Sequence, residues 1–244
     1  MRQEEIRVDV EGHPMRAILT VPETGRKAPG LVIVFEILGL NDEMKRVARD
    51  FAAKGYASIL PDLFDRPDPK PLCVAKTLLD QRLGRGRSFT AIENARRTLA
   101  ARSEVDGERL GIVGFCLGGG FAIAVGARGG YKVAAPFYGM MPSDTESVRS
   151  LCPTVASYGA RDTLFVSQGE KLRRHLEQYR IPHDYKLYEG AGHSFMTHMP
   201  APFEIFDPIH PLHPGFHAPS EKDAWERMLA FFRTHLDAPD EASA

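Results

Sequence analysis

A cysteine framed by glycines is the first feature of this sequence that could do chemistry. Cys116 stands in the run Gly114-Phe115-Cys116-Leu117-Gly118, after apolar residues 110–113 and before a stretch of small residues. A strand, a sharp turn and a helix in that order make a nucleophile elbow, which holds a reactive side chain at a strained turn. The helix would point its positive dipole end at the sulfur and favour the thiolate. The alternative is a buried cysteine in a nucleotide-binding turn, but Gly-x-Gly-x-x-Gly in register and a following Gly-Lys-Ser/Thr are both missing.

Asp162 and His193 supply the two other groups that a cysteine nucleophile needs. A histidine takes the thiol proton and returns it to the leaving group, and a carboxylate on the other ring nitrogen fixes the tautomer. Both residues follow predicted strands, and His193 lies in a loop with Gly190 and Gly192. Nucleophile, acid, then histidine is the chain order expected of such a triad. Alone, such an aspartate is more often a helix cap and such a histidine a surface residue.

Glu36 is an acidic residue at the end of an otherwise apolar strand, residues 31–35. A carboxylate in that position is costly unless it has a partner. The thiol of Cys116 is one candidate partner and a nearby arginine is another. The alternative, equally weighted on the local sequence, is a residue that faces solvent at the strand terminus.

The elements that must position these groups alternate between strands and helices. Residues 6–10 and 15–21 predict an antiparallel hairpin at a sheet edge. Ser88 or Thr90 would cap a helix ending near 102, and residues 105–107 would form the turn after it. We expect further strands at 31–35, 56–60, 110–113, 133–137, 153–157 and 184–188, and helices at 42–54, 74–82, 88–102, from 121, 166–179 and 224–236.

This alternation predicts an α/β fold: a mostly parallel, doubly wound sheet with an antiparallel N-terminal edge hairpin. We expect a single domain over residues 1–244, with 237–244 as a frayed tail. In open sheets of this kind, functional groups gather at the carboxyl ends of the strands. Glu36, Cys116, Asp162 and His193 all stand at predicted strand ends.

The composition excludes several other classes of protein. The 244 residues are 43% hydrophobic and 26% charged, with a formal net charge of −1, so nothing points to a nucleic-acid or membrane-surface partner. The charged residues 1–5 lack the apolar core of a secretory signal, and no apolar stretch is long enough to span a bilayer. Only three cysteines are present, which fits a reducing cytoplasm rather than a disulfide framework.

The sequence also gives no metal signature. Cys-x-x-Cys and His-Glu-x-x-His are both missing, so we expect no zinc site. Four of the nine histidines cluster in a proline-rich segment, but their spacing matches no helical or zinc-finger pattern, and we interpret the segment as a loop. Cys73 and Cys152 are expected to be inert.

Several stretches of the sequence together resemble the dienelactone hydrolase family of the α/β-hydrolase superfamily. The cysteine elbow and the Glu-Ile-x-Gly-x-Asn segment make the resemblance specific, and it covers nearly the whole chain. The matching stretches are residues 35–41, 61–64, 114–119, 137–139, 159–162, 192–195 and 224–227. The resemblance implies an α/β-hydrolase fold and a Cys116–His193–Asp162 triad that works without a cofactor. It also implies that Glu36 pairs with the resting thiol until a substrate shifts it to draw off the thiol proton.

The resemblance assigns further roles around the triad. The backbone N–H groups of Ile37 and Leu117 would form the oxyanion hole. In the family, two arginines hold a carboxylate on the substrate. Arg66 stands at the first of these positions, whereas Thr197 stands where the second arginine would be. Half of a bidentate clamp is therefore missing, and residues 200–219, rich in proline and histidine, are also unusual for the family.

The sequence thus predicts a cytoplasmic hydrolase that cleaves an ester or lactone through Cys116 and an acyl-enzyme. Its partner would be a small-molecule substrate, and we expect a monomer or weak homodimer. One alternative is a non-catalytic binder of small molecules, or a redox-sensing thiol protein, on the same fold. Another is a thioesterase or neutral esterase with altered specificity.

Overall fold

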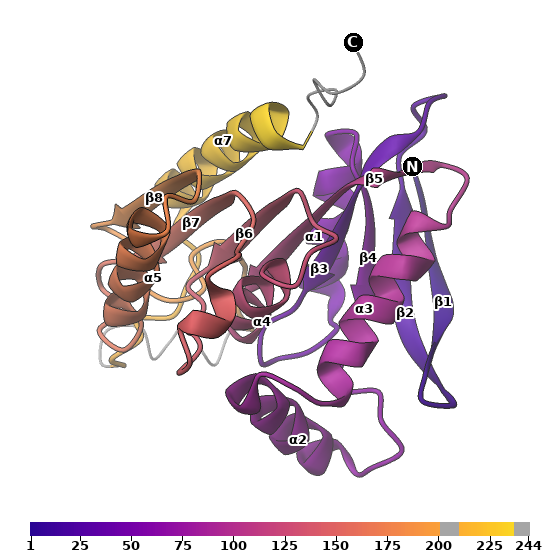
Figure 1. Ribbon diagram of the computed structural model, residues 1–244, viewed down its shortest axis with the longest axis horizontal. Helices are drawn as coiled ribbons and strands as arrows, with labels where there is room; N and C mark the ends of the chain where they lie inside the picture. The colour runs from indigo at the N-terminus through magenta and orange to yellow at the C-terminus, as the bar shows by residue number, and fades with distance from the viewer. Residues whose placement is uncertain (201–209, 237–244) are drawn as a thin grey trace.

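The computed structural model describes residues 1–200 and 210–236, which form one twisted sheet with helices packed against it (Figure 1). Its strands are β1 Arg2–Val10, β2 His13–Val21, β3 Ala28–Val34, β4 Ala57–Pro61, β5 Val105–Phe115, β6 Val133–Phe137, β7 Thr154–Gly159 and β8 His183–Tyr188. The strands lie in the order β1-β2-β4-β3-β5-β6-β7-β8, antiparallel at β1–β2 and β2–β4 and parallel elsewhere. This confirms the predicted sheet and its N-terminal edge hairpin. The predicted tail, 237–244, lies outside the described residues.

Helices cover both faces of the sheet. They are α1 Asp42–Ala53, α2 Lys70–Leu83, α3 Arg87–Ala100, α4 Leu117–Gly126, α5 Val166–Gln178 and α7 Ala218–His235, with a short 3₁₀ helix at Glu146–Val148. Asn41 caps α1, because its side chain accepts a hydrogen bond from the N–H of Met44. No helix in the described part of the chain is long and apolar enough to cross a membrane.

Two glycines in neighbouring strands show on which face of the sheet a helix packs. A side chain at Gly30 would meet Leu99 of α3, whereas one at Gly111 would meet Leu236, which follows α7. In the parallel pairing of β3 with β5, Gly30 lies opposite Leu110 and Gly111 opposite Leu31, so the two glycines face opposite sides of the sheet. The helices α3 and α7 therefore pack on opposite faces.

Aromatic contacts join the helices within each layer. Phe51 of α1 packs on Trp225 of α7 with ring centroids 4.6 Å apart, and Phe89 of α3 packs on Phe121 of α4 at 5.2 Å. The strands β3, β4 and β6 lie between these layers and are almost wholly buried. Their continuous apolar sequences follow from that double coverage.

Two local predictions are wrong. Residues 105–107, predicted as a turn, begin strand β5, because Val105 and Asp106 pair with Ala28 and Pro29 ahead of a shift in register. The cap of α3 is Gly86 rather than Ser88 or Thr90. Ser88 lies inside the helix and gives both its N–H and its hydroxyl to Asp80 of α2.

Candidate active site

Cys116 stands at the tip of a strained turn between β5 and α4. Its backbone has φ 53° and ψ −112°, a conformation that few residues other than glycine adopt. The turn is held because the N–H of Cys116 donates to Phe137 of β6 and that of Gly118 donates to Phe35, each over 3.1 Å. The cysteine is partly exposed, although the residues before and after it are buried. This is the geometry of a nucleophile elbow.

Backbone atoms of neighbouring residues pass very close to the two glycines on either side of the cysteine. A Cβ on Gly114 would lie 2.0 Å from the carbonyl oxygen of Gly118, and a Cβ on Gly118 would lie 2.0 Å from that of Val34. Neither carbonyl oxygen can move away easily, because both belong to the backbone. The crossing therefore requires glycine at both positions, as the Gly-x-Cys-x-Gly pattern predicts.

His193 and Asp162 meet beneath this turn. Their Nδ1 and Oδ2 atoms lie 2.6 Å apart, and both side chains are almost fully buried. Burial alone would lower the pKa of His193, but its interactions with Asp162 and Cys116 outweigh burial and raise the pKa to about 10. The site therefore favours an imidazolium at His193.

Residues 212–215 hydrogen-bond to the loop that carries His193. Leu212 accepts a hydrogen bond from the N–H of His193 over 2.8 Å, and the carbonyl of His193 accepts one from Gly215 over 3.0 Å. A Cβ on Gly192 would lie 1.9 Å from the carbonyl oxygen of His213, so the two chains are in close contact. For this segment the sequence predicts only a loop. Its role in fixing His193 could not be predicted, because no local pattern reveals a pairing between residues 19 positions apart.

Glu36 is buried with hydroxyl groups around it. Its Oε1 accepts from Thr197 over 2.9 Å and from Tyr138 over 3.1 Å. Burial raises the pKa of Glu36, although the charge of His193 and the hydroxyls of Thr197 and Ser194 oppose that rise. The solvent-facing alternative is thus wrong, since Glu36 is only 5% exposed. Its partners among the described residues include no arginine.

These groups line one cavity of about 510 Å³. Its polar lining residues are Glu36, Gln81, Cys116, His193, Ser194 and His210. Its apolar lining residues are Ile37, Leu78, Leu117, Met140, Phe165, Met199, Leu212 and Pro214. Asp162 stands behind His193 and supports it from outside the cavity.

Two backbone N–H groups border the cavity beside Cys116. Those of Ile37 and Leu117 donate to no backbone carbonyl among residues 1–200 and 210–236. Leu117 is the first residue of α4, where the N–H groups have no partner within the helix and the dipole end is positive. Such a pair can receive an oxygen that becomes negatively charged.

Arg66 does not reach this cavity, which corrects its predicted role in binding substrate. Its guanidinium lies 2.6 Å from Asp80 of α2 and 2.7 Å from the hydroxyl of Ser88 of α3. A third contact, over 3.2 Å, reaches Thr77. The side chain is only 6% exposed. Through Nε and Nη2, the arginine therefore joins α2 to α3 and to the loop after β4.

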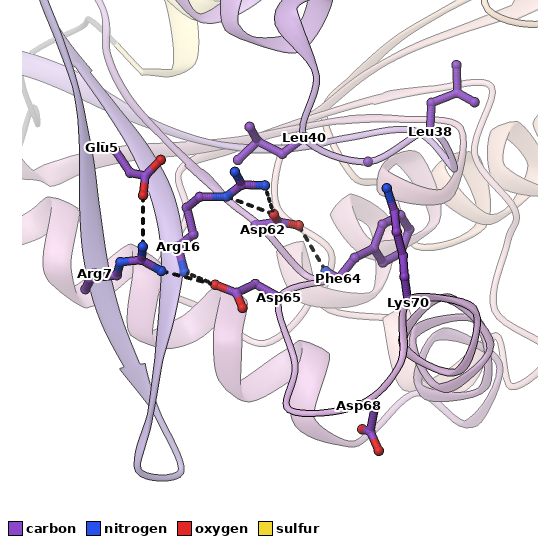
Figure 2. Close-up of a pocket in the computed structure, with 11 residues that line it drawn as sticks. Glu5, Arg7, Arg16, Leu38, Leu40, Asp62, Phe64, Asp65, Asp68 and Lys70 are labelled. Carbon is purple, nitrogen blue, oxygen red and sulfur yellow. Dashed lines mark hydrogen bonds and ion pairs between the residues drawn. The ribbon is translucent and has the colours of Figure 1, made fainter.

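A second hollow, of about 430 Å³, is lined in part by residues 38–40 (Figure 2). Its charged groups are mostly paired with one another: Arg16 binds Asp62 over 2.6 Å, and the N–H of Arg16 donates to Asp65, also over 2.6 Å (Figure 2). It contains no nucleophile with a base beside it. No three metal-binding side chains are grouped in the described part of the chain.

A mostly parallel sheet with a nucleophile elbow at the carboxyl end of a central strand defines an α/β-hydrolase. The sequence profile of the dienelactone hydrolase family matches residues 15–236. The chain belongs to the dienelactone hydrolase family and is a hydrolase.

The relatives of this chain are distant in sequence but match over most of their length. The chain is 25% identical to a probable 2-oxo-3-(5-oxofuran-2-ylidene)propanoate lactonase of Bradyrhizobium, over 94% of this chain and 93% of the relative. It is 26% identical to a carboxymethylenebutenolidase of Rhodococcus opacus, over 84% and 81%. A crystal structure of a putative dienelactone hydrolase from Klebsiella pneumoniae superposes with a TM-score of 0.77 at 24% identity, over 95% of this chain and 98% of that one. That structural likeness supports the fold.

Proposed function

We propose that the protein hydrolyses a small ester or lactone through Cys116, with His193 as acid and base and Asp162 as the partner of the histidine. The observation that carries the proposal is the 2.6 Å contact between His193 and Asp162 beside a cysteine at a nucleophile elbow. A binder or a redox thiol needs neither of those two buried residues. The relatives named as a lactonase and a carboxymethylenebutenolidase support the same class of substrate.

In the first step, the thiolate of Cys116 attacks the carbonyl carbon. The oxygen that becomes negative is received by the N–H groups of Ile37 and Leu117. Since Nδ1 of His193 faces Asp162, its Nε2 gives a proton to the leaving alkoxide as the ester bond breaks. A thioester on Cys116 and a free alcohol result. In a lactone, that alcohol stays attached to the acyl group.

In the second step, water attacks the thioester. His193 takes a proton from the water, the same two N–H groups hold the oxyanion, and the sulfur leaves as the thiolate while the acid is released. Glu36 has a raised pKa and lines the same cavity, so we propose that it accepts the proton of the resting thiol before the attack and returns it to the sulfur after the acid is released. The positive end of α4 stabilises the thiolate in both steps.

Replacing the nucleophile tests this proposal. Cys116→Ala should abolish the release of p-nitrophenol from p-nitrophenyl butyrate while the circular dichroism spectrum and Tm stay unchanged. Cys152→Ala is the matched control, because burial raises the pKa of the Cys152 thiol to about 12 and keeps it protonated. That variant should keep full activity. Mass spectrometry of the quenched wild-type reaction should find one acyl group, on Cys116, and turnover by Cys116→Ala would refute the mechanism.

A further inference from the structure

The described lining of the cavity beside Cys116 offers no lysine or arginine to an anionic substrate. Residues 201–209, which join the lining residues Met199 and His210 in the chain, also contain none. Both nitrogens of His193 have partners, since Asp162 takes Nδ1 and Cys116 interacts with the same ring. Glu36, the acidic residue in the lining, would repel an anion when it is ionised.

Apolar side chains converge on the mouth of the cavity from three elements. Ile37 comes from the loop after β3, Leu78 from α2 and Met140 from the loop after β6. They are 40%, 43% and 50% exposed, so the protein leaves them incompletely covered. Large apolar side chains left open at the mouth of a site are typical of a surface that a ligand covers.

The helix that carries Leu78 is fixed in place. Gln81, one turn further along α2, donates from Nε2 to the carbonyl of Leu117 over 2.7 Å. At the same time, the bonds of Arg66 to Asp80 join α2 to the body of the protein. The position of this wall is therefore built into the fold, and Arg66 pairs with Asp80 rather than lining the cavity.

We propose that the substrate is uncharged on its acyl side, that an apolar acyl group packs against Ile37, Leu78 and Met140, and that a carboxylate on that group is rejected. The proposal rests on the hydrolysis proposed above and names its substrate class. A carboxylate that leaves water for this cavity would lose hydration without gaining a partner, which is a costly transfer. An alkyl chain would gain affinity with each methylene that it buries.

A series of p-nitrophenyl esters at neutral pH tests the proposal, with spontaneous hydrolysis subtracted. From acetate to butyrate to hexanoate, kcat/KM should rise by about fourfold per added methylene. The matched anion is the p-nitrophenyl monoester of adipic acid, which has the same six-carbon acyl chain ending in a carboxylate. Hexanoate should exceed it in kcat/KM by about 100-fold or more. Equal rates, or a faster anionic ester, would overturn the proposal and leave the hydrolytic function standing.

Two neighbouring leucines provide the variant and its control. Leu78→Arg adds a guanidinium to the cavity wall and should raise kcat/KM for the anionic ester relative to hexanoate by about tenfold. Leu79 is next to it on α2 and 53% exposed but does not line the cavity, so Leu79→Arg should leave the ratio unchanged. Equal changes in both variants would overturn the role given to Leu78. If no ester is cleaved and Cys116 stays unacylated, the hydrolytic function itself fails.

Discussion

Replacing Arg66 by methionine should destabilise the protein and leave its substrate preference unchanged. The guanidinium and the Asp80 carboxylate are 2.6 Å apart, and their side chains are only 6% and 15% exposed. Removing one partner of a buried ion pair costs about 3–5 kcal/mol, because the other charge is left uncompensated. Asp80 keeps two hydrogen bonds from Ser88, so we expect about 3 kcal/mol, the lower end of that range. For a chain of this length, Tm should fall by about 6–12 °C.

The assay pairs thermal unfolding with the ester series. In a double variant, Arg66→Met with Asp80→Asn, the neutral amide removes the uncompensated charge, so part of the lost Tm should return. The ratio of kcat/KM between p-nitrophenyl hexanoate and the anionic adipate monoester should be the same in Arg66→Met as in the wild type. An unchanged Tm would refute the buried ion pair. A selective loss of activity toward the anionic ester would instead show that Arg66 binds the substrate.

Three further predictions concern the site. Burial raises the pKa of Glu36, so the folded state loses stability as pH rises above the unfolded pKa of about 4.5. The Tm of Glu36→Gln should therefore increase relative to that of the wild type between mildly acidic and mildly alkaline pH. Parallel curves of Tm against pH for the two proteins would contradict this. Asp162→Asn should lower kcat/KM by about 10³–10⁴-fold. The stabilisation lost in that variant should be largest below pH about 6.5 and disappear as pH rises through about 10, the pKa of His193. Gly118→Ala should prevent folding, seen by circular dichroism, whereas Gly215→Ala, with open space around its Cα, should fold normally.

The elbow and the sheet could be predicted because their causes are local. Residues 110–113 are apolar throughout because β5 is covered on both faces, and Gly114 and Gly118 are required by a crossing a few residues long. Cys116, Asp162 and His193 each follow a predicted strand, so all three could be placed at strand ends. The structure brings the last two within hydrogen-bonding distance.

Arg66 could not be assigned from the sequence because its partners are distant in the chain. Asp80 lies 14 residues further on and Ser88 lies 22 further on, in two different helices. The motif that precedes Arg66 predicts where its backbone goes, but which carboxylate its side chain reaches depends on the docking of α2 against α3. The same holds for Glu36, whose hydroxyl partners Tyr138 and Thr197 lie 102 and 161 residues away.

The proton balance of the site agrees with a neutral substrate. The charge of His193 is what lowers the proton affinity of Glu36 most, and burial is what raises it, so the two groups titrate as a coupled pair. A second carboxylate in this cavity would place another negative charge near Glu36, raise the pKa of Glu36 further and disturb the coupled exchange of protons between Glu36 and His193. An uncharged acyl group leaves that exchange undisturbed and also excludes water from the apolar wall.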